Sequence, residues 1–192
     1  MLKTGQVEAD ETFIGPNPKF MHRRRLEKRR AGRTDGYVDK TIVARLLERP
    51  KKGTKGKSRV HAEVVPTTQA YDLVPPVKDN VTPGSEMITD ANRSDWGVRD
   101  QYIHSVIDHT QAYVKGHVHT NGIENFWSLL KRMIHGTYVG VSSFHLGAYM
   151  DEEVFRFNER GDHDGGRFGR VLRNVTGCRI TYERLINGPA LA

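Results

Sequence analysis

One helical pattern constrains the fold of this chain more than any other feature of its sequence. Between His119 and Ile134, in the stretch HTNGIENFWSLLKRMI, apolar residues recur at i, i+3, i+4, i+7 and i+11. They are Ile123, Phe126, Trp127, Leu130 and Ile134. Because an α-helix turns once in about 3.6 residues, this spacing places all of them on one stripe that faces a core. We assign Trp127 to this packing rather than to a binding surface.

The polar face of the same helix carries two opposite charges. Glu124 and Lys131 have six residues between them, so they lie two helical turns apart and point in nearly the same direction. This arrangement allows both side chains to act on one ligand. Asn121 also lies on this face, three residues before Glu124, and the two residues alternatively form a capping box, a local arrangement that needs no catalysis.

Three segments upstream of this helix have the composition of β-strands. The segment Gly5–Gly15 mixes β-branched and aromatic residues with acids and ends at Gly-Pro, which predicts a strand that contains Asp10. The apolar run Lys40–Glu48 predicts a buried strand, and the segment 59–66 (RVHAEVVP) predicts the next. A turn rich in Gly and Lys separates these two strands, so we expect them to form a hairpin.

A helix and a further strand are expected after the hairpin. The segment 67–81 starts with a capping Thr and has helical apolar spacing, although the adjacent prolines at 75 and 76 are expected to break or end the helix. The segment 85–92 predicts a short strand with Asp90 at its carboxyl end. The segment 95–109 favours a mostly helical or mixed structure. This order predicts an α/β domain with a mixed sheet flanked by helices, a ribonuclease H-like fold.

Length and composition set further bounds. The 192 residues are enough for one domain, with a core at about 5–160 and a helical tail at about 161–192. The 30 Lys and Arg against 23 Asp and Glu, a net charge of +7, favour a polyanionic partner, first of all nucleic acid.

Cys178 is the single cysteine, which excludes an intrachain disulfide and a cysteine-based zinc cluster. The apolar runs are too short for a signal peptide or membrane span, so we expect a soluble, cytoplasmic protein.

Two segments concentrate the positive charge. The segment Lys19–Arg33 is expected to be an exposed basic loop, and residues 49–59 form a second basic turn. Both could neutralise phosphates along bound DNA, and the alternative is that they are solvated connectors. We assign DNA contact to Arg23, Arg24, Arg25, Lys28, Arg29, Arg30, Lys51, Lys52 and Lys131.

Five strings in one order carry a family resemblance. They are VEADETFIG, MITDANRSDWG, HTNGIENFWSLLKR, FRFNER and GCRITYERLING. Together they resemble the catalytic domain of insertion-sequence family fifteen-ninety-five, the ISXO-like group of DDE transposases. The spacing also resembles that of DDE enzymes, since 33 residues separate Asp90 from Glu124 and six separate Glu124 from Lys131.

The resemblance implies a catalytic site and a reaction. Asp10, Asp90 and Glu124 would hold divalent metal, and Lys131 would contact DNA near the reacting phosphate. The ions would be Mg²⁺ or Mn²⁺, two in number, because carboxylate oxygens suit such hard cations. Asn121 is kept as a possible ligand. His119 matches a histidine common in the family and is a further candidate that would approach the metal or the scissile phosphate, and the alternative is a strand-end histidine that makes a backbone hydrogen bond. The implied activity is cleavage of transposon-end DNA and its transfer into target DNA, by a homodimer or larger synaptic complex at the nucleoid.

The chain also departs from the family pattern. Members commonly carry a zinc ribbon and a helical DNA-binding region before the catalytic domain, and we expect both to be absent here. A catalytically inactive remnant that binds DNA or a full-length partner is therefore the alternative function.

Overall fold

The fold was analysed in a computed structural model that describes residues 5–15, 19, 22–31, 40–50, 56–90, 100–107 and 120–187. In these residues the strands are β1 (Gln6–Ile14), β2 (Thr41–Glu48), β3 (Arg59–Val65), β4 (Glu86–Asp90) and β5 (Ile103–Ile107). The α-helices are α1 (Arg23–Ala31), α2 (Ala70–Asn80), α3 (Asn121–Arg132), α4 (Leu146–Asn158), α5 (Asp164–Val175) and α6 (Tyr182–Asn187). A π-helical turn, Met133–Thr137, continues α3, and a 3₁₀ turn, Ser143–His145, precedes α4.

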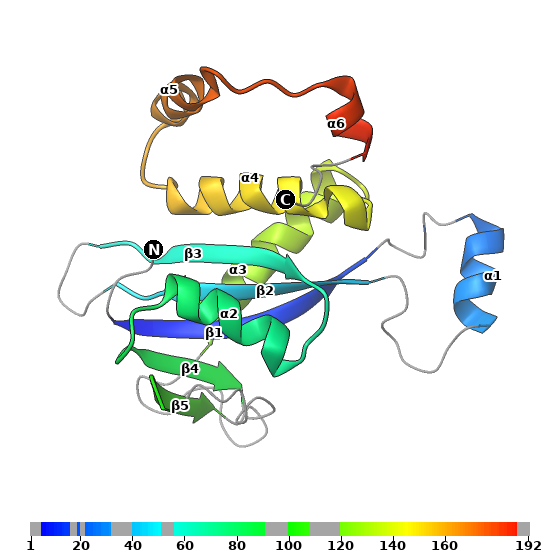
Figure 1. Cartoon of the computed structure of the whole chain (residues 1–192). Helices are drawn as coiled ribbons and strands as arrows, with labels where there is room; N and C mark the ends of the chain where they lie inside the picture. Colours follow the sequence, from blue (N-terminus) through cyan, green and yellow to red (C-terminus); the bar gives the residue numbers. More distant parts are fainter. Residues whose placement is uncertain are drawn as a thin grey trace.

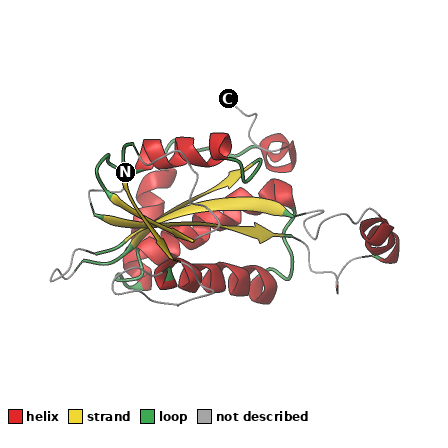
Figure 2. Ribbon diagram, turned by 90° about the horizontal axis from the view of Figure 1, so that it is seen from below, coloured by secondary structure: helices red, strands yellow, loops and turns green. Residues whose placement is uncertain are grey.

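The five strands form one mixed sheet in the order β3-β2-β1-β4-β5 (Figure 1). The pairs β1–β2 and β2–β3 are antiparallel, whereas β1–β4 and β4–β5 are parallel. Helices cover both faces of the sheet (Figure 2). This order and these directions confirm the predicted α/β, ribonuclease H-like fold, including the hairpin of β2 and β3.

Side chains that alternate along β1 enter two separate cores. Val7 and Ala9 pack with Leu73 and Val77 of α2 on one face of the sheet. On the other face, Ile14 belongs to a second cluster with side chains of β2, β3, α3 and α4. Because successive residues of a strand point to opposite faces, Glu8 and Asp10 lie on the α3 face together with Ile14.

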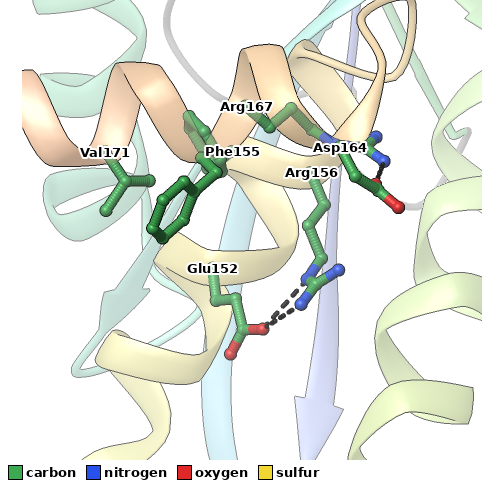
Figure 3. A pocket seen from close by; sticks show the side chains of 7 residues that line it. Glu152, Phe155, Arg156, Asp164, Arg167 and Val171 are labelled. Atoms are coloured by element: carbon green, nitrogen blue, oxygen red, sulfur yellow. Dashed lines mark hydrogen bonds and ion pairs between the residues drawn. The ribbon is translucent and has the colours of Figure 1, made fainter.

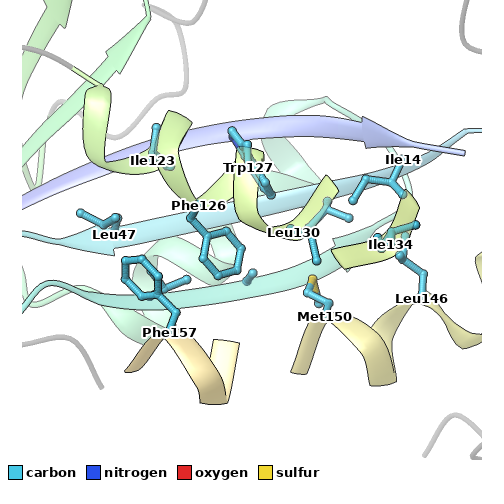
Figure 4. Packing of buried hydrophobic residues seen from close by; sticks show 13 residues of the cluster. Ile14, Leu47, Ile123, Phe126, Trp127, Leu130, Ile134, Leu146, Met150 and Phe157 are labelled. Carbon is cyan, nitrogen blue, oxygen red and sulfur yellow. The ribbon is translucent and has the colours of Figure 1, made fainter. Parts of the chain in front are cut away.

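The apolar stripe of α3 is buried as predicted. Its members, Ile123, Phe126, Trp127, Leu130 and Ile134, are each at most 6% exposed and pack against β1, β2 and α4 (Figure 4). The aromatic rings meet edge to face, with centroids 5.3 Å apart for Phe126 and Phe157 and 6.0 Å apart for Phe126 and Trp127. These contacts fix α3 between the sheet and α4.

Two of the predicted elements are wrong in type. The segment 19–33, predicted as a loop, contains α1 instead. Its Arg, Lys, Leu and Glu residues favour helix, and Arg23 pairs with Glu27 one turn later at 2.8 Å. Of the segment 95–109, residues 100–107 are described, and they contain β5 rather than a helix. The β-branched residues of β5 extend the sheet beyond β4 through parallel pairing.

The prolines of α2 do not end the helix. It continues through Pro75 and Pro76 to Asn80, although each proline lacks the N–H that would bond to the carbonyl four residues earlier. Pro76 is buried beside Leu73 and Val77, so packing against the sheet holds the helix together where its own hydrogen bonds are interrupted. Thr67 is not the residue that caps the helix, but its hydroxyl contacts Asp72 of the first turn at 2.5 Å. No helix in the described part of the chain is long and apolar enough to cross a membrane.

Candidate active site

Two aspartates lie on neighbouring parallel strands, β1 and β4. The β1–β4 ladder pairs Gln6 with Glu86, Val7 with Met87 and Glu8 with Ile88, a constant difference of 80 in residue number. The pairing ends there, and Asp10 of β1 and Asp90, the last residue of β4, each lie two residues beyond it. Because residues two apart on a strand point to the same face, both aspartates lie on the α3 face of the sheet, and both are half-buried.

Glu124 and Lys131 lie on the exposed face of α3. Glu124 is in the first turn and Lys131 in the last, which suits the helix dipole. The capping box between Asn121 and Glu124 is wrong, because Thr120 occupies the N-cap position and Asn121 is the first residue of the helix, where it is exposed. The hydroxyl of Thr120 donates a hydrogen bond to Glu124 Oε1 at 3.2 Å.

Glu8 anchors the first turn of α3 to β1. Its Oε2 accepts a hydrogen bond from the backbone N–H of Ile123 at 2.8 Å, and its Oε1 accepts one from Arg49 Nε at 2.6 Å. The side chain of Glu8 is 1% exposed, so this ion pair is shielded from water. Gly122 permits the close approach, since an added Cβ would lie 3.0 and 3.1 Å from the two carboxylate oxygens.

Trp127 contacts Asp10 directly. The indole N–H donates a hydrogen bond to Asp10 Oδ2 at 2.8 Å, while the ring itself is only 6% exposed. Assigning Trp127 to the apolar stripe was correct for its ring but missed this contact. A signal was available, because a buried indole N–H normally finds an acceptor and Trp127 lies one turn from Glu124.

Arg45 places a buried positive charge on the strand next to Asp10. It is the cross-strand partner of Asp10 and is 2% exposed. Its guanidinium carbon lies 3.6 Å from the ring centroid of Phe126 and 4.9 Å from that of Trp127, and its Nη1 donates to the carbonyl of Ile123 at 3.1 Å. Burial lowers the pKa of Arg45 well below its usual value, and the negative charges of Glu8 and Asp10 act in the opposite direction. Sequence reasoning missed this residue, because nothing local marks an arginine inside a buried strand.

The carboxylates fit an oxygen-preferring cation in chemistry but do not form a complete ligand set. Mg²⁺ and Mn²⁺ favour the carboxylate oxygens that Asp10 and Asp90 provide on adjacent strands. Among the described residues, however, no three His, Cys, Asp or Glu side chains are grouped closely enough to hold a metal ion. Within the described part of the chain, Glu124 in the first turn of α3 therefore does not complete a three-ligand site with the two aspartates.

The residues assigned to DNA contact lie on different elements. Arg23 and Arg24 are exposed on α1, which stands apart from the sheet in both views, and Lys131 is exposed on α3 (Figures 1 and 2). The other candidates of the first basic segment, Arg25, Lys28, Arg29 and Arg30, also belong to α1. Lys51, Lys52 and His119 lie outside the described residues.

A separate hollow of about 460 Å³ opens between α4 and α5 (Figure 3). It is lined by Glu152, Phe155, Arg156, Asp164, Arg167, Phe168 and Val171. Its charged groups are paired with one another, Arg156 with Glu152 at 2.9 Å and Arg167 with Asp164. The hollow contains none of the candidate catalytic residues.

Comparison with known proteins connects these features to one family. Residues 3–158 match the family model described as an ISXO2-like transposase domain. A protein of Haemophilus influenzae described as an uncharacterized transposase-like protein is 35% identical over 104 residues, which cover 53% of this chain and 83% of the relative. No solved structure matches the chain. The family match ends at the last residue of α4.

Proposed function

The chain belongs to the ISXO2-like transposase domain family, and from that premise we propose that it is a DNA strand-transferase. It would cleave transposon-end DNA and join it to target DNA in a reaction that depends on divalent metal. The observation that supports this proposal is that Asp10 and Asp90 lie on adjacent parallel strands, each two residues beyond the pair Glu8–Ile88, on the face of the sheet that α3 covers. Helix α3 carries Glu124 and Lys131 on its exposed side.

Each candidate residue has a task in such a reaction. Asp10, Asp90 and Glu124 would hold two Mg²⁺ or Mn²⁺ ions, with Asn121 as an alternative oxygen ligand. When bound, such ions supply Lewis-acid stabilisation to the attacking and leaving oxygens of an in-line displacement. Lys131 would place its ammonium group beside a non-bridging phosphate oxygen, where negative charge develops in the transition state. Holding Glu124 and Lys131 on one rigid helix keeps the acid and the cation at a constant separation.

DNA binding would rest on the basic elements. The exposed arginines of α1 and the net charge of +7 favour contact with the phosphate backbone, and His119, Lys51 and Lys52 remain candidates for the same DNA. Joining two transposon ends to a target requires that both ends be held together. We therefore propose a homodimer or a larger synaptic complex as the working form.

The test is nicking of a labelled transposon-end duplex in Mn²⁺. We expect Asp10→Asn, Asp90→Asn and Glu124→Gln each to lower the rate at least about 10²-fold, the cost of removing one strong electrostatic contact from a transition state. Asp79→Asn is the matched control, since Asp79 is exposed on α2 at the opposite face of the sheet. Wild-type rates in all three carboxylate variants would falsify the proposal.

A second candidate function is DNA binding without cleavage. It is favoured by the incomplete grouping of metal-binding side chains among the described residues. Such a protein would bind the same duplex with strong salt dependence and leave it intact in Mn²⁺. Robust joining of strands by the purified chain would exclude this alternative.

A further inference from the structure

Helix α3 is joined to β1 at two points by side chains of β1. Glu8 Oε2 accepts from the backbone N–H of Ile123, and Asp10 Oδ2 accepts from the indole N–H of Trp127, both at 2.8 Å. The two acids are two residues apart on a strand, about 6.8 Å, and their partners are four residues apart on a helix, about 6 Å. The spacings match, so α3 lies along β1 in one register.

The indole ring of Trp127 has little freedom to turn. Arg45 covers it at 4.9 Å from the ring centroid, and Phe126 meets it edge to face at 6.0 Å. The ring is 6% exposed, so rotation would displace packed side chains. Its N–H is therefore held toward Asp10 by the core itself.

We propose that Trp127 is a positioning residue for the candidate active site. Its indole N–H fixes the orientation of the Asp10 carboxylate relative to Glu124 and Lys131, which stand on the same helix. A carboxylate oxygen that accepts one hydrogen bond keeps a second lone pair, so this contact is compatible with metal ligation by Asp10. The inference rests on the proposed function, because it assigns Asp10 a metal-binding task.

Packing alone does not account for a tryptophan at this position. A phenylalanine would also fill an apolar stripe, whereas a buried indole N–H is costly unless it has an acceptor. Hydrogen bonds that orient a metal ligand are typically worth about 10- to 100-fold in metal affinity. Removal of this hydrogen bond is therefore predicted to weaken metal binding more than it lowers the stability of the fold.

The experiment measures both the Mn²⁺ affinity, by calorimetry, and the thermal stability of the wild type and of two variants. Trp127→Phe removes the N–H but keeps a ring beside Phe126, and we expect its Kd for Mn²⁺ to rise about 10- to 100-fold. Leu130→Ala is the matched control, because Leu130 is a fully buried member of the same stripe. We expect this control to lose stability while it retains wild-type Mn²⁺ affinity.

A second experiment measures the hydrogen bond between Trp127 and Asp10 in the absence of metal. We expect the indole N–H of Trp127 to exchange slowly with solvent in the wild type and at least about tenfold faster in Asp10→Ala, because its acceptor is removed. Trp127→Phe identifies the resonance, since the sequence holds two tryptophans.

The results distinguish a wrong positioning role for Trp127 from a wrong proposed function. If the wild type and Leu130→Ala bind Mn²⁺ and Trp127→Phe binds it equally well, the positioning role is wrong. A loss of affinity in both variants that follows their loss of stability also overturns it, because the effect is then structural. If the wild type binds no Mn²⁺, or if Asp10→Asn binds it as the wild type does, the proposed function itself fails and the role of Trp127 falls with it.

Discussion

At the scale of single residues, the fit of α3 against β1 depends on the absence of a side chain at Gly122. A Cβ there would lie 3.0 and 3.1 Å from the Glu8 carboxylate oxygens and 3.2 Å from Leu47 Cδ2. Glu8 has little room to give way, because Arg49 and the N–H of Ile123 hold its two oxygens. The glycine thus lets a buried carboxylate cap the helix that carries Glu124 and Lys131.

Gly122→Ala is expected to destabilise the protein by about 1–2 kcal/mol through overpacking, despite the better helix propensity of alanine. The measurement is urea unfolding of this variant beside Gly147→Ala. Gly147 is a matched control, since it is likewise the second residue of its helix but an added Cβ there meets nothing within 4 Å. The control should be neutral or up to about 1 kcal/mol more stable. Equal effects in the two variants would show that Glu8 moves aside freely.

The residues of the candidate active site differ in how far the sequence alone predicts them. Asp10, Asp90 and Glu124 were singled out as candidates because acids inside or beside apolar runs stand out, and the resemblance implies their roles. Arg45 and the N–H of Trp127 were missed, because their importance comes from partners that lie 35 and 117 residues away in the chain. Strand alternation places Glu8 on the face of Asp10, but its bond to the N–H of Ile123 depends on tertiary packing.

At the scale of elements, composition predicted β1 and the helical spacing of apolar residues predicted α3, and the structure contains both. The helix α2 was predicted, but β5 and the effect of the prolines in α2 were misjudged, because tertiary contacts decide them: pairing with β4 in one case and burial of Pro76 in the other. The parallel pairing of β1 with β4, which sets Asp10 and Asp90 on adjacent strands, also cannot be read from either strand alone.

Helix α4 carries an acid on its buried face, and this makes stability depend on pH. Glu153 is 8% exposed, and burial raises its pKa above the usual value, with Arg156 opposing the shift. A raised folded-state pKa means that folding favours the protonated form. The contribution of this residue to stability is therefore fully present below the unfolded-state pKa and is lost as the pH rises through the folded-state pKa.

Glu153→Gln should consequently raise Tm by a few degrees at pH 7, because it removes the cost of burying a charge. The advantage should shrink as the pH is lowered toward 4, where the wild-type side chain becomes protonated. Thermal unfolding at several pH values measures this difference. Glu63→Gln is the control, since its side chain is 41% exposed. A Tm gain at pH 7 that persists unchanged at pH 4 would contradict the argument.

At the scale of the whole molecule, the structure divides at the end of α4. Asn158 makes two hydrogen bonds to the backbone of Val60 in β3, and Arg160 reaches Ser58 beside the same strand. Beyond this point, no side chain of α5 is buried, although the whole helix is described. The large apolar side chains left exposed there are Phe168, Val171, Leu172, Val175, Ile180, Tyr182, Leu185 and Ile186. The buried structure and the family match, which ends at residue 158, therefore stop at nearly the same place.

A chain shortened after Asp162 is expected to keep a cooperative transition with a Tm within a few degrees of the full chain. The reason is that it retains both apolar clusters and the bonds of Asn158 and Arg160, while it loses only surface helices. A second chain shortened after His145 also lacks Leu146, Met150 and Phe157 of α4, and it should not fold, because their removal opens the core against α3. Circular dichroism during heating compares the two. If the first truncation also abolished cooperative unfolding, α5 and α6 would have to stabilise the domain through contacts other than burial of their own side chains.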